Sequence, residues 1–358
     1  MKTLLLAPEL FTTNGGIPRM LRLYLKALCE LTPSAPQNHV GFVALNDDTA
    51  DSADLRRYST SALTHWETCQ RSKLQFIRAT LRHSRPGQHV VCGHIAQLPV
   101  AWAAQRCRRG LRYDLVAHGI EVWRDFTLAE RLALRAARRI LCVSAYTRDE
   151  MRRHCGLPES RFVVLPNALD PFFPIAGQPP SPAAEPVVLT VSRLVRSDAY
   201  KGIDHLIQAM PRIRQRVPGA RLQVVGQGDD LPRLTALARS AGVTQCVEFL
   251  GYIGDQALQA RLRECAIFAL PSQREGFGLV FLEAMAQGRP CLAAQAGGAP
   301  EVLTPETGSL VPFGDVEALA NAAAEALQRT WDGAAILARA RSFSYPLFRE
   351  RLKTLLVA

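Results

Sequence analysis

Short, largely apolar runs recur along the chain and alternate with segments in which apolar residues return every third or fourth position. The runs are typical of parallel strands buried on both faces, and the longer period is typical of helices that cover a sheet. Predicted strands lie at 4–8, 39–45, 90–92, 113–117, 140–143, 162–165, 187–191, 266–270 and 291–294, and residues 247–253 are predicted as a further strand with its loop. Predicted helices lie at 19–31, 72–83, 128–139, 203–214, 316–327 and 344–356. This alternation predicts an α/β fold built on parallel sheets.

A proline-rich stretch separates two such series. Residues 171–186 contain six prolines, a composition typical of a semi-rigid linker between domains. We therefore predict a Rossmann-like N-terminal domain over 1–170, a linker over 171–186 and a second domain over 187–340, with a final helical segment over 341–358. The 358 residues suffice for two domains of ordinary size.

The composition is that of a globular protein. Hydrophobic residues make up 48% of the chain and charged residues 21%, and no apolar run reaches the roughly 18 residues that a membrane-spanning helix needs. The first apolar segment is too short for a signal peptide. Nine cysteines without a Cys-x-x-Cys pair predict reduced core residues, neither a disulfide framework nor a zinc site. Together these features predict a cytoplasmic protein.

The net charge of +11 is concentrated in the N-terminal half. Residues 1–170 hold 24 Lys and Arg against 15 Asp and Glu, and the remainder holds 19 against 17. This asymmetry favours an anionic partner such as a phospholipid surface or a lipid diphosphate, and the basic amphipathic segment 72–83 fits interfacial docking. Nucleic acid is disfavoured because the basic residues are not interleaved with aromatic ones. A solvated, arginine-rich surface is the alternative.

Two acidic residues follow the predicted strand 266–270. Glu275 lies in a loop after that strand, and Glu283 lies in the next helix, which stops at Gly288. Eight residues of helix rise about 12 Å, which exceeds the 5–9.5 Å of a glycosidase carboxylate pair. The helix N-terminus between the two acids suits an anion. A carboxylate, an anion site and a second carboxylate in this order therefore suit a nucleotide-sugar. The alternative is that both are ordinary solvated acids on the surface.

Other candidate groups lie where predicted strands end. Arg193 and Lys201 flank the loop after strand 187–191, so both cations can reach one phosphate, although a surface pair is the alternative. His118 follows strand 113–117 and is either a turn residue or a site residue. Gly15 and Gly16 follow the first strand and suit a backbone phosphate nest, without the Lys-Ser/Thr of a P-loop.

A glycine-rich turn at 226–230 invites a dinucleotide-binding interpretation. Leu231 stands where the third glycine of that fingerprint belongs, and the motif lies in the second domain. An oxidoreductase is therefore disfavoured.

The combined pattern resembles glycosyltransferase family 4. Glu275 and Glu283 form Glu-x7-Glu within Pro-Ser-x-x-Glu-Gly-Phe-Gly, and Gly-Gly-Ala-Pro-Glu follows at 297–301. The resemblance covers 187–330 well, 1–30 and 113–170 in part, and 33–110 hardly at all. It implies the GT-B fold, with two Rossmann-like βαβ domains facing each other across a cleft and a C-terminal helix that crosses back to the first domain. It also implies retaining, metal-independent chemistry.

The same resemblance assigns roles to individual residues. It implies that Arg193 and Lys201 bind the donor diphosphate, Glu283 the ribose and Glu275 the hexose hydroxyls. The string His-Gly-Ile-Glu-Val-Trp resembles members that build bacterial polysaccharides, and places His118 beside the donor hexose. His118, Glu275, Arg193 and Lys201 are thus the expected catalytic residues. Further donor contacts are expected at Gly15, Gly16, Asn167, Gly251, Tyr252, Ile253, Gly276, Phe277, Gly278 and Leu279. Asn167 lies in Pro-Asn-Ala-Leu-Asp, where the family has Pro-Asn-Gly-Val-Asp.

The expected activity is transfer of a hexose from a nucleotide-diphosphate sugar to a glycan or lipid-linked acceptor in cell-surface polysaccharide synthesis. The resemblance to bacterial mannosyltransferases favours GDP-mannose over glucose or GlcNAc donors. No Asp-x-Asp occurs in the chain, so no metal or other cofactor is expected. Peripheral attachment at the inner face of the plasma membrane is a further expectation. The alternatives are an epimerase or phosphorylase of the same fold, or a non-catalytic nucleotide-sugar-binding subunit.

Overall fold

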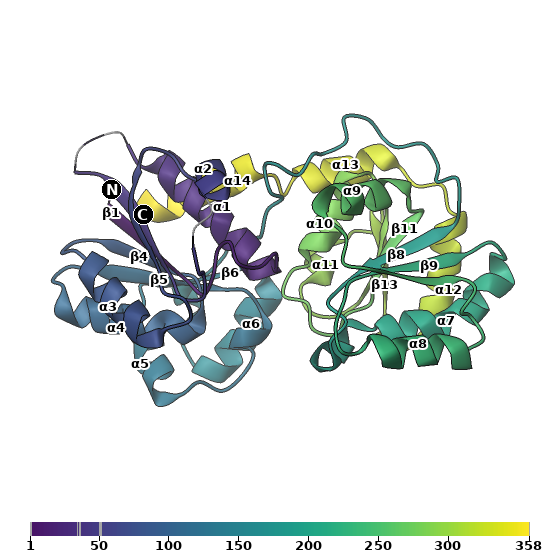
Figure 1. Ribbon diagram of the computed structural model, residues 1–358, viewed down its shortest axis with the longest axis horizontal. Coiled ribbons are helices and arrows are strands. Elements are labelled where there is room, and N and C mark those ends of the chain that lie inside the picture. The colour runs from purple at the N-terminus through teal and green to yellow at the C-terminus, as the bar shows by residue number, and fades with distance from the viewer. Residues whose placement is uncertain (1, 34, 36, 50–51, 358) are drawn as a thin grey trace. The chain divides into compact units, whose positions relative to one another are not determined.

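The chain divides into two compact units. The computed structural model describes residues 2–33, 35, 37–49 and 52–357. Unit 1 comprises residues 1–170 together with 345–358, and unit 2 comprises residues 171–344 (Figure 1). Residues 171–186, predicted as a linker, cluster with unit 2, where the Ala176 N–H donates to the Ala286 carbonyl at 2.8 Å.

Unit 1 is built on a sheet of seven parallel strands in the order β3-β2-β1-β4-β5-β6-β7. The strands are β1 (Lys2–Ala7), β2 (His39–Ala44), β3 (Leu63–Thr68), β4 (His89–Cys92), β5 (Arg112–Ala117), β6 (Arg139–Cys142) and β7 (Phe162–Val164). The central strands are buried on both faces, as their continuous apolar runs predict.

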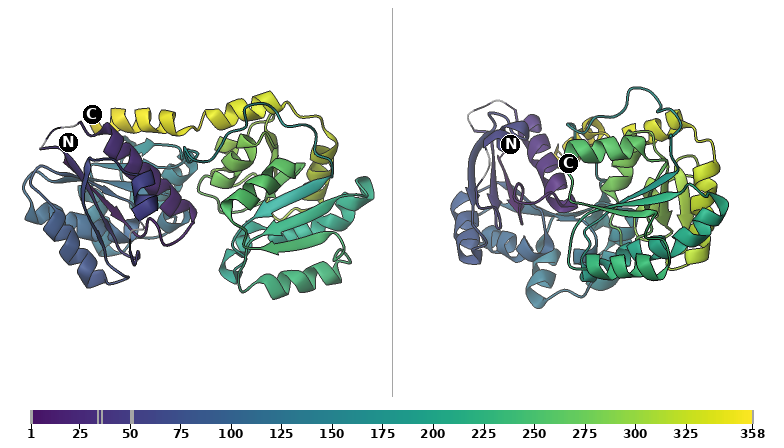
Figure 2. Two further views of the ribbon diagram at one scale, coloured as in Figure 1. Left: turned by 45° about the horizontal axis from the view of Figure 1, so that its top comes forward. Right: turned by 45° about the vertical axis from the view of Figure 1, so that its right-hand side comes forward.

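Helices cover both faces of this sheet (Figures 1 and 2). They are α1 (Gly16–Leu31), α2 (Ser52–Arg57), α3 (Lys73–His83), α4 (Leu98–Cys107), α5 (Leu128–Ala136), α6 (Ala145–Cys155) and α14 (Tyr345–Val357), with the 3-10 turns η1 (Ile95–Gln97), η2 (Ile120–Val122) and η3 (Glu159–Arg161). Helix α4 lies between α3 and α5 and contacts both, whereas α14 packs on α1. The predicted helix over 128–139 is too long, because Arg139 begins β6.

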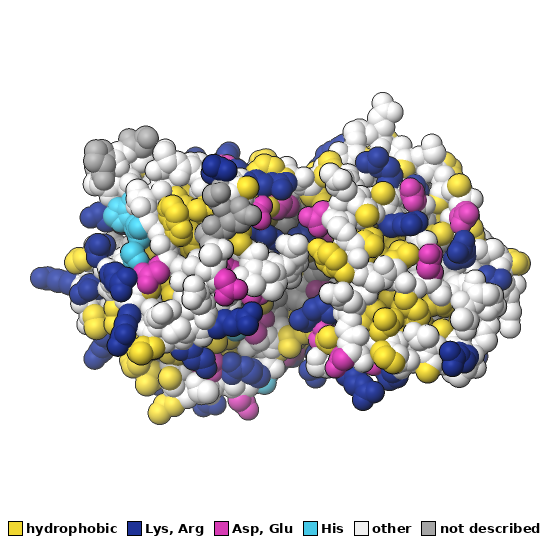
Figure 3. Space-filling view, in the orientation of Figure 1, with side chains coloured by type: hydrophobic (Ala, Val, Ile, Leu, Met, Phe, Trp, Pro, Cys, Tyr) yellow, Lys and Arg dark blue, Asp and Glu magenta, His cyan; other side chains and the backbone are white. Residues whose placement is uncertain are grey.

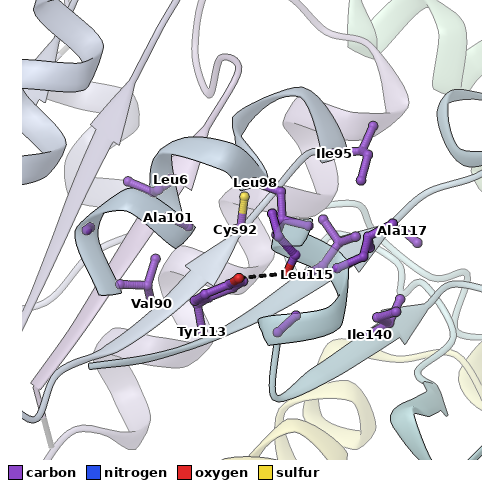
Figure 4. Close-up of a cluster of buried hydrophobic side chains, with 14 of the residues drawn as sticks. Leu6, Val90, Cys92, Ile95, Leu98, Ala101, Tyr113, Leu115, Ala117 and Ile140 are labelled. Atoms are coloured by element: carbon purple, nitrogen blue, oxygen red, sulfur yellow. Dashed lines mark hydrogen bonds between the residues drawn. The ribbon is translucent and has the colours of Figure 1, made fainter. Parts of the chain in front are cut away.

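A buried apolar cluster joins α3, α4 and α5 to one face of the sheet. Leu6, Val90, Cys92 and Leu115 project from the strands toward Leu98 and Ala101 of α4 (Figure 4). The Tyr113 hydroxyl is buried in this cluster and donates to the Ala133 carbonyl of α5 at 2.6 Å. This bond satisfies the one polar atom that β5 sends into the cluster and fixes α5 against the sheet.

Unit 2 repeats the plan with six parallel strands in the order β10-β9-β8-β11-β12-β13. They are β8 (Val187–Val191), β9 (Arg221–Val225), β10 (Val247–Gly251), β11 (Ile267–Leu270), β12 (Cys291–Ala294) and β13 (Gly308–Val311). The connections between these strands contain η4 (Arg196–Lys201), α7 (Ile203–Arg216), α8 (Leu231–Ser240), α9 (Asp255–Glu264), α10 (Leu279–Ala286) and α11 (Ala299–Val302), and α12 (Val316–Gln328) and α13 (Gly333–Arg341) follow the last strand. The α/β prediction is confirmed in both units.

Each sheet reverses its strand order once, and open α/β sheets bind ligands beside such a reversal. In unit 2 the reversal lies between β8 and β11, whose carboxyl ends carry the Lys201 and Glu275 loops. In unit 1 it lies between β1 and β4, which lead into the Gly15-Gly16 loop and into Gly93. The topology therefore gathers the predicted site residues of each unit at one sheet edge.

Candidate active site

An ion pair between Lys201 and Glu275 lies at the centre of the unit 2 site. Lys201 Nζ is 2.7 Å from Glu275 Oε2, and the two side chains are only 18% and 15% exposed. The loops that carry them are joined directly, because the Gln273 N–H donates to the Tyr200 carbonyl at 2.8 Å. Gly202 has φ +72° and turns so close to Pro271 that a Cβ would lie 2.5 Å from the Pro271 oxygen. Two loops 74 residues apart in the sequence thus bring one cation and one carboxylate together.

The carboxylate keeps this lysine charged. Burial by itself would lower the pKa of Lys201, but the adjacent Glu275 outweighs burial and raises that pKa above its ordinary value. The ammonium is therefore a permanent positive charge at neutral pH. Positive charge held in a partly dry site suits a phosphate or diphosphate.

A double glycine positions the loop of Glu275. The Gly298 N–H donates to the Glu275 carbonyl at 2.7 Å. A Cβ on Gly297 would lie 2.3 Å from the Glu275 oxygen, and one on Gly298 would lie 2.3 Å from the Gly276 oxygen. Only glycine allows this close approach of two backbones, which gives the Gly-Gly-Ala-Pro-Glu motif a physical reason.

Helix α10 begins directly after this loop. Gly276, Phe277 and Gly278 are buried, and Gly278 has φ +91° where the chain turns into the helix at Leu279. The N-terminus of α10 has no side-chain cap, so its first N–H groups suit an anionic ligand. Glu283 is only 2% exposed on this helix. The alternative of two solvated surface acids is wrong, because both Glu275 and Glu283 lie largely out of the solvent.

Arg193 stands at the other end of the connection from β8 to α7. Its side chain is 75% exposed and lies 2.8 Å from Asp198 Oδ2. Asp198 is itself buried, and Asp230 and Arg233 line the same small hollow. An exposed guanidinium held by one carboxylate can turn to a phosphate that enters beside it.

The loop after β10 adds an exposed aromatic ring to this edge. The Gly226 N–H donates to the Gly251 carbonyl at 2.8 Å, and Gly251 has φ +67°. Tyr252 is 63% exposed and Ile253 is half-buried. A flat exposed ring beside main-chain polar groups suits a nucleotide base.

In unit 1 the Gly15-Gly16 loop is held by a carboxylate that the sequence pattern did not single out. Asp47 is fully buried and accepts hydrogen bonds from the Leu10 N–H at 2.9 Å, the Thr12 N–H at 3.0 Å and the Thr12 hydroxyl at 2.8 Å. Gly15 then forms the N-cap of α1, and Gly16 begins the helix. Asp47 follows strand β2 within a polar loop, so only its place after a strand end could have drawn attention to it.

His118 lies buried at the end of β5. Its Nε2 is 3.1 Å from the Gly93 carbonyl, which can only accept, so Nε2 carries the proton and Nδ1 offers a lone pair. Burial lowers the pKa of His118 to about 4, so the ring is neutral at pH 7. A neutral imidazole here can accept a hydrogen bond from a hydroxyl group. Asn167, the remaining predicted contact in unit 1, is buried after β7.

Relatives of known function extend over the whole chain. The family described as "Glycosyltransferase Family 4" matches residues 29–172, and "Glycosyl transferases group 1" matches residues 185–329. A GDP-mannose-dependent monoacylated alpha-(1-6)-phosphatidylinositol monomannoside mannosyltransferase of Corynebacterium glutamicum is 30% identical over 391 aligned positions, which cover 99% of this chain and 97% of that protein. The chain belongs to glycosyltransferase family 4.

Another relative of this family 4 chain aligns with part of it, and a solved structure shares its fold. A GDP-mannose-dependent alpha-(1-6)-phosphatidylinositol monomannoside mannosyltransferase of Mycolicibacterium smegmatis is 35% identical over 255 residues, and the match spans 65% of each chain. HepE of Anabaena, solved with UDP-glucose, is 21% identical with a TM-score of 0.77 over the full length of both chains. The predicted family and GT-B fold are confirmed.

Within the described ranges, no group of three His, Cys, Asp or Glu side chains could hold a metal ion. Four charged groups of unit 2 are predicted to meet a donor, and all four follow β8 or β11 in the sequence: Arg193, Lys201, Glu275 and Glu283.

Proposed function

We propose that this family 4 chain is a retaining hexosyltransferase that uses a nucleotide-diphosphate sugar without a metal ion. The Lys201–Glu275 ion pair at the strand reversal of unit 2 carries this proposal. Lys201 and Arg193 neutralise the diphosphate, Glu275 binds hexose hydroxyls and Glu283 binds the ribose. These fixed charges and the N-terminus of α10 supply the stabilisation that a metal supplies elsewhere. His118 accepts a hydrogen bond from a hexose hydroxyl through Nδ1.

In the proposed reaction the bond between the anomeric carbon and the diphosphate oxygen breaks, and its electron pair leaves with the diphosphate. The acceptor hydroxyl oxygen then bonds to the same face of the anomeric carbon. Its proton passes to the departing phosphate oxygen. Lys201 and Arg193 stabilise the charge that develops on this leaving group.

We propose GDP-mannose as the donor and a glycan or lipid-linked acceptor in cell-surface polysaccharide synthesis. Both mannosyltransferase relatives are described as GDP-mannose-dependent and as acting on a phosphatidylinositol mannoside. HepE was solved with UDP-glucose, so a UDP-sugar is the competing donor.

A thermal-shift panel of UDP, GDP, ADP and their hexose conjugates in EDTA tests the donor. A ligand at about 100 times its dissociation constant stabilises the protein by roughly 2.7 kcal/mol. GDP-mannose should raise the melting temperature most. Lys201→Met should abolish this shift, whereas the matched control Lys353→Met, an exposed lysine of α14, should keep it. Equal shifts in both variants, or a shift only when Mg²⁺ replaces EDTA, would contradict the proposed site.

Turnover separates the transferase from the alternatives. Formation of mannose 1-phosphate from the donor and inorganic phosphate would favour the phosphorylase, and an altered nucleotide-sugar formed without an acceptor would favour the epimerase. Tight donor binding without product for any mannoside or lipid-linked acceptor would favour a non-catalytic subunit.

We also propose that unit 1 docks on an anionic membrane at the cytoplasmic face. The surface concerned, the α3–α5 surface, is the outward side of α3, α4 and α5. Its exposed apolar side chains are Leu74, Ile77, Leu128 and Leu132, and its cations are Lys73, Arg78, Arg82, Arg106, Arg131 and Arg135. Figure 3 shows apolar and basic side chains interspersed over this part of unit 1. Apolar groups among cations suit a phospholipid interface.

Acidic residues are scarce on the α3–α5 surface. No Asp or Glu occurs between Glu67 and Asp114, whereas that stretch contains nine Lys and Arg residues. The one carboxylate of the three helices, Glu130, is buried and bonded to Arg124 at 2.7 Å and to the Thr127 N–H at 2.9 Å. In the part of the chain that the structure describes, no helix is long and apolar enough to cross a membrane.

A further inference from the structure

Glu121 holds the turn that carries His118. Its Oε1 accepts hydrogen bonds from the His118 N–H at 2.5 Å and from the Gly119 N–H at 3.1 Å. Gly119 has φ +148° between β5 and η2, a conformation that favours glycine. One carboxylate therefore fixes the two peptide groups that set the direction of the imidazole.

The neighbouring strand end supplies a second histidine. His94 follows β4, and its Nδ1 accepts from the Ala96 N–H at 3.1 Å, so the proton of the neutral ring sits on Nε2. Gly93, the residue before it, accepts the Nε2–H of His118. The ends of β4 and β5 are thus tied together around His94, His118 and Glu121.

Glu121 and His94 influence each other's charge. Burial raises the pKa of Glu121, while the N–H groups of His118 and Gly119 and the charge of His94 oppose that rise. Burial lowers the pKa of His94, and the Glu121 carboxylate opposes that fall. His118 and Arg124 also lower the pKa of His94 through their charges, Glu130 raises it, and Glu121 acts in turn on Cys142 of β6.

We propose that Glu121 is a positioning residue for His118: its carboxylate holds the two peptide N–H groups of the turn, and its ionisation, which electrostatic pairing with His94 favours, sets how firmly the turn is held. An ionised Glu121 accepts two charge-assisted bonds from the turn. A protonated Glu121 accepts them more weakly, so the imidazole of His118 loses its fixed direction. The part of this proposal that concerns catalysis rests on the proposed function, whereas the electrostatic pairing does not.

The first test needs no substrate. Imidazole nitrogens of the full chain, labelled with ¹⁵N-histidine, are titrated by NMR in the wild type and in Glu121→Gln, whose amide oxygen can still accept both N–H groups. His118 should remain the neutral Nε2–H tautomer in the wild type, and His94 should titrate at a lower pH in Glu121→Gln. His89, which pairs with Asp114 at 3.0 Å, is the internal reference, and Glu159→Gln on the exposed turn η3 is the matched control. The same His94 titration in the wild type and in Glu121→Gln would overturn the pairing.

The second test uses transfer from GDP-mannose. We expect kcat of Glu121→Gln to fall roughly tenfold with little change in the donor KM, as for a misplaced contact group. Wild-type kcat should fall as the pH drops through the titration of Glu121, and the variant should lack this step. A normal kcat and pH profile in Glu121→Gln would overturn the positioning role. If the wild type transfers no mannose but the His94 titration still changes in Glu121→Gln, only the proposed function would be contradicted.

Discussion

At the scale of single residues, the ion pair of Lys201 and Glu275 is the feature on which the proposed donor site depends. Lys201 and Glu275 are far apart in the chain, each has a conventional surface interpretation, and the structure joins them at 2.7 Å in a mostly buried site. Removing one member of such a pair leaves the other charge with little solvent, which is costly. The effects of substituting Lys201 and Glu275 on the free energy of unfolding should therefore be strongly coupled.

A double-mutant cycle with Lys201→Met, Glu275→Gln and the double variant measures this coupling by urea unfolding. We expect a coupling free energy of about 1–3 kcal/mol. The control cycle uses Arg212 and Glu317, which lie 3.0 Å apart on the exposed surface of unit 2 and should couple by less than about 1 kcal/mol. Equal couplings would mean that the buried pair is no more than a surface contact. Glu275→Gln should also abolish transfer, and intact turnover would end its role in hexose binding.

Asp114 of unit 1 gives a pH prediction. Burial alone would raise the pKa of Asp114, but hydrogen bonds from His89 at 3.0 Å and Arg138 at 2.8 Å outweigh burial and lower it. A folded-state pKa below the unfolded one stabilises the fold above the unfolded value, about 3.9, and this stabilisation is lost as the pH falls through the folded value. Asp114→Asn should cost about 1–3 kcal/mol at pH 7. In urea unfolding its deficit against the wild type should shrink below pH 4, while the exposed Asp125→Asn stays near the wild type throughout.

At the scale of elements, strand ends and the loops after them carry almost all of the candidate chemistry. The buried strands β8 and β12 lie where their apolar runs predict, because a strand buried on both faces has a continuous apolar signature. Strand β3 was not predicted, since it is a sheet edge whose residues alternate between exposed and half-buried. Helix α4 was also missed, because its apolar residues resemble those of a buried strand.

Two glycines of unit 2 test how tightly the Glu275 loop is held. Gly297 and Gly314 have φ +61° and +82°, but a Cβ on Gly297 would meet the Glu275 backbone at 2.3 Å, whereas one on Gly314 would meet nothing within 4 Å. Gly314→Ala should cost about 1–2 kcal/mol for its left-handed backbone alone. Gly297→Ala should cost about 1–3 kcal/mol more by urea unfolding, and should weaken the GDP-mannose thermal shift. Equal costs, with an unchanged shift, would mean that the two loops can separate freely.

At the scale of the whole molecule, the excess positive charge is gathered in unit 1 together with exposed apolar groups. Leu128 and Leu74 are 75% and 57% exposed on the α3–α5 surface. Neighbouring cations favour anionic lipid by about 1 kcal/mol each near a charged membrane. Cosedimentation with phosphatidylcholine vesicles, with or without phosphatidylglycerol, measures this attraction directly.

The wild type should pellet with the anionic vesicles at low salt and be released as salt is raised. Leu128→Glu/Arg131→Glu should reduce binding at least about tenfold, because two favourable contacts become repulsive. The control, Leu347→Glu/Arg351→Glu, changes the same residue types on exposed positions of α14. An equal loss of vesicle binding in both double variants would mean that only the net charge of the protein matters. Binding to DNA in place of vesicles would assign the α3–α5 surface to nucleic acid.

The sequence by itself determined the βα alternation, the two series of strands, the charge asymmetry and the family pattern around Glu275. These features are local, because periodicity, glycine turns and motif spacing are properties of neighbouring residues. Tertiary structure decided which strand ends meet. It paired Lys201 with Glu275, set Asp47 against the loop before Gly15 and Gly16, and joined the ends of β4 and β5 through the bond from His118 to the Gly93 carbonyl. Such pairs depend on strand order and on the burial of individual atoms, and neither is encoded in the spacing of residues along the chain.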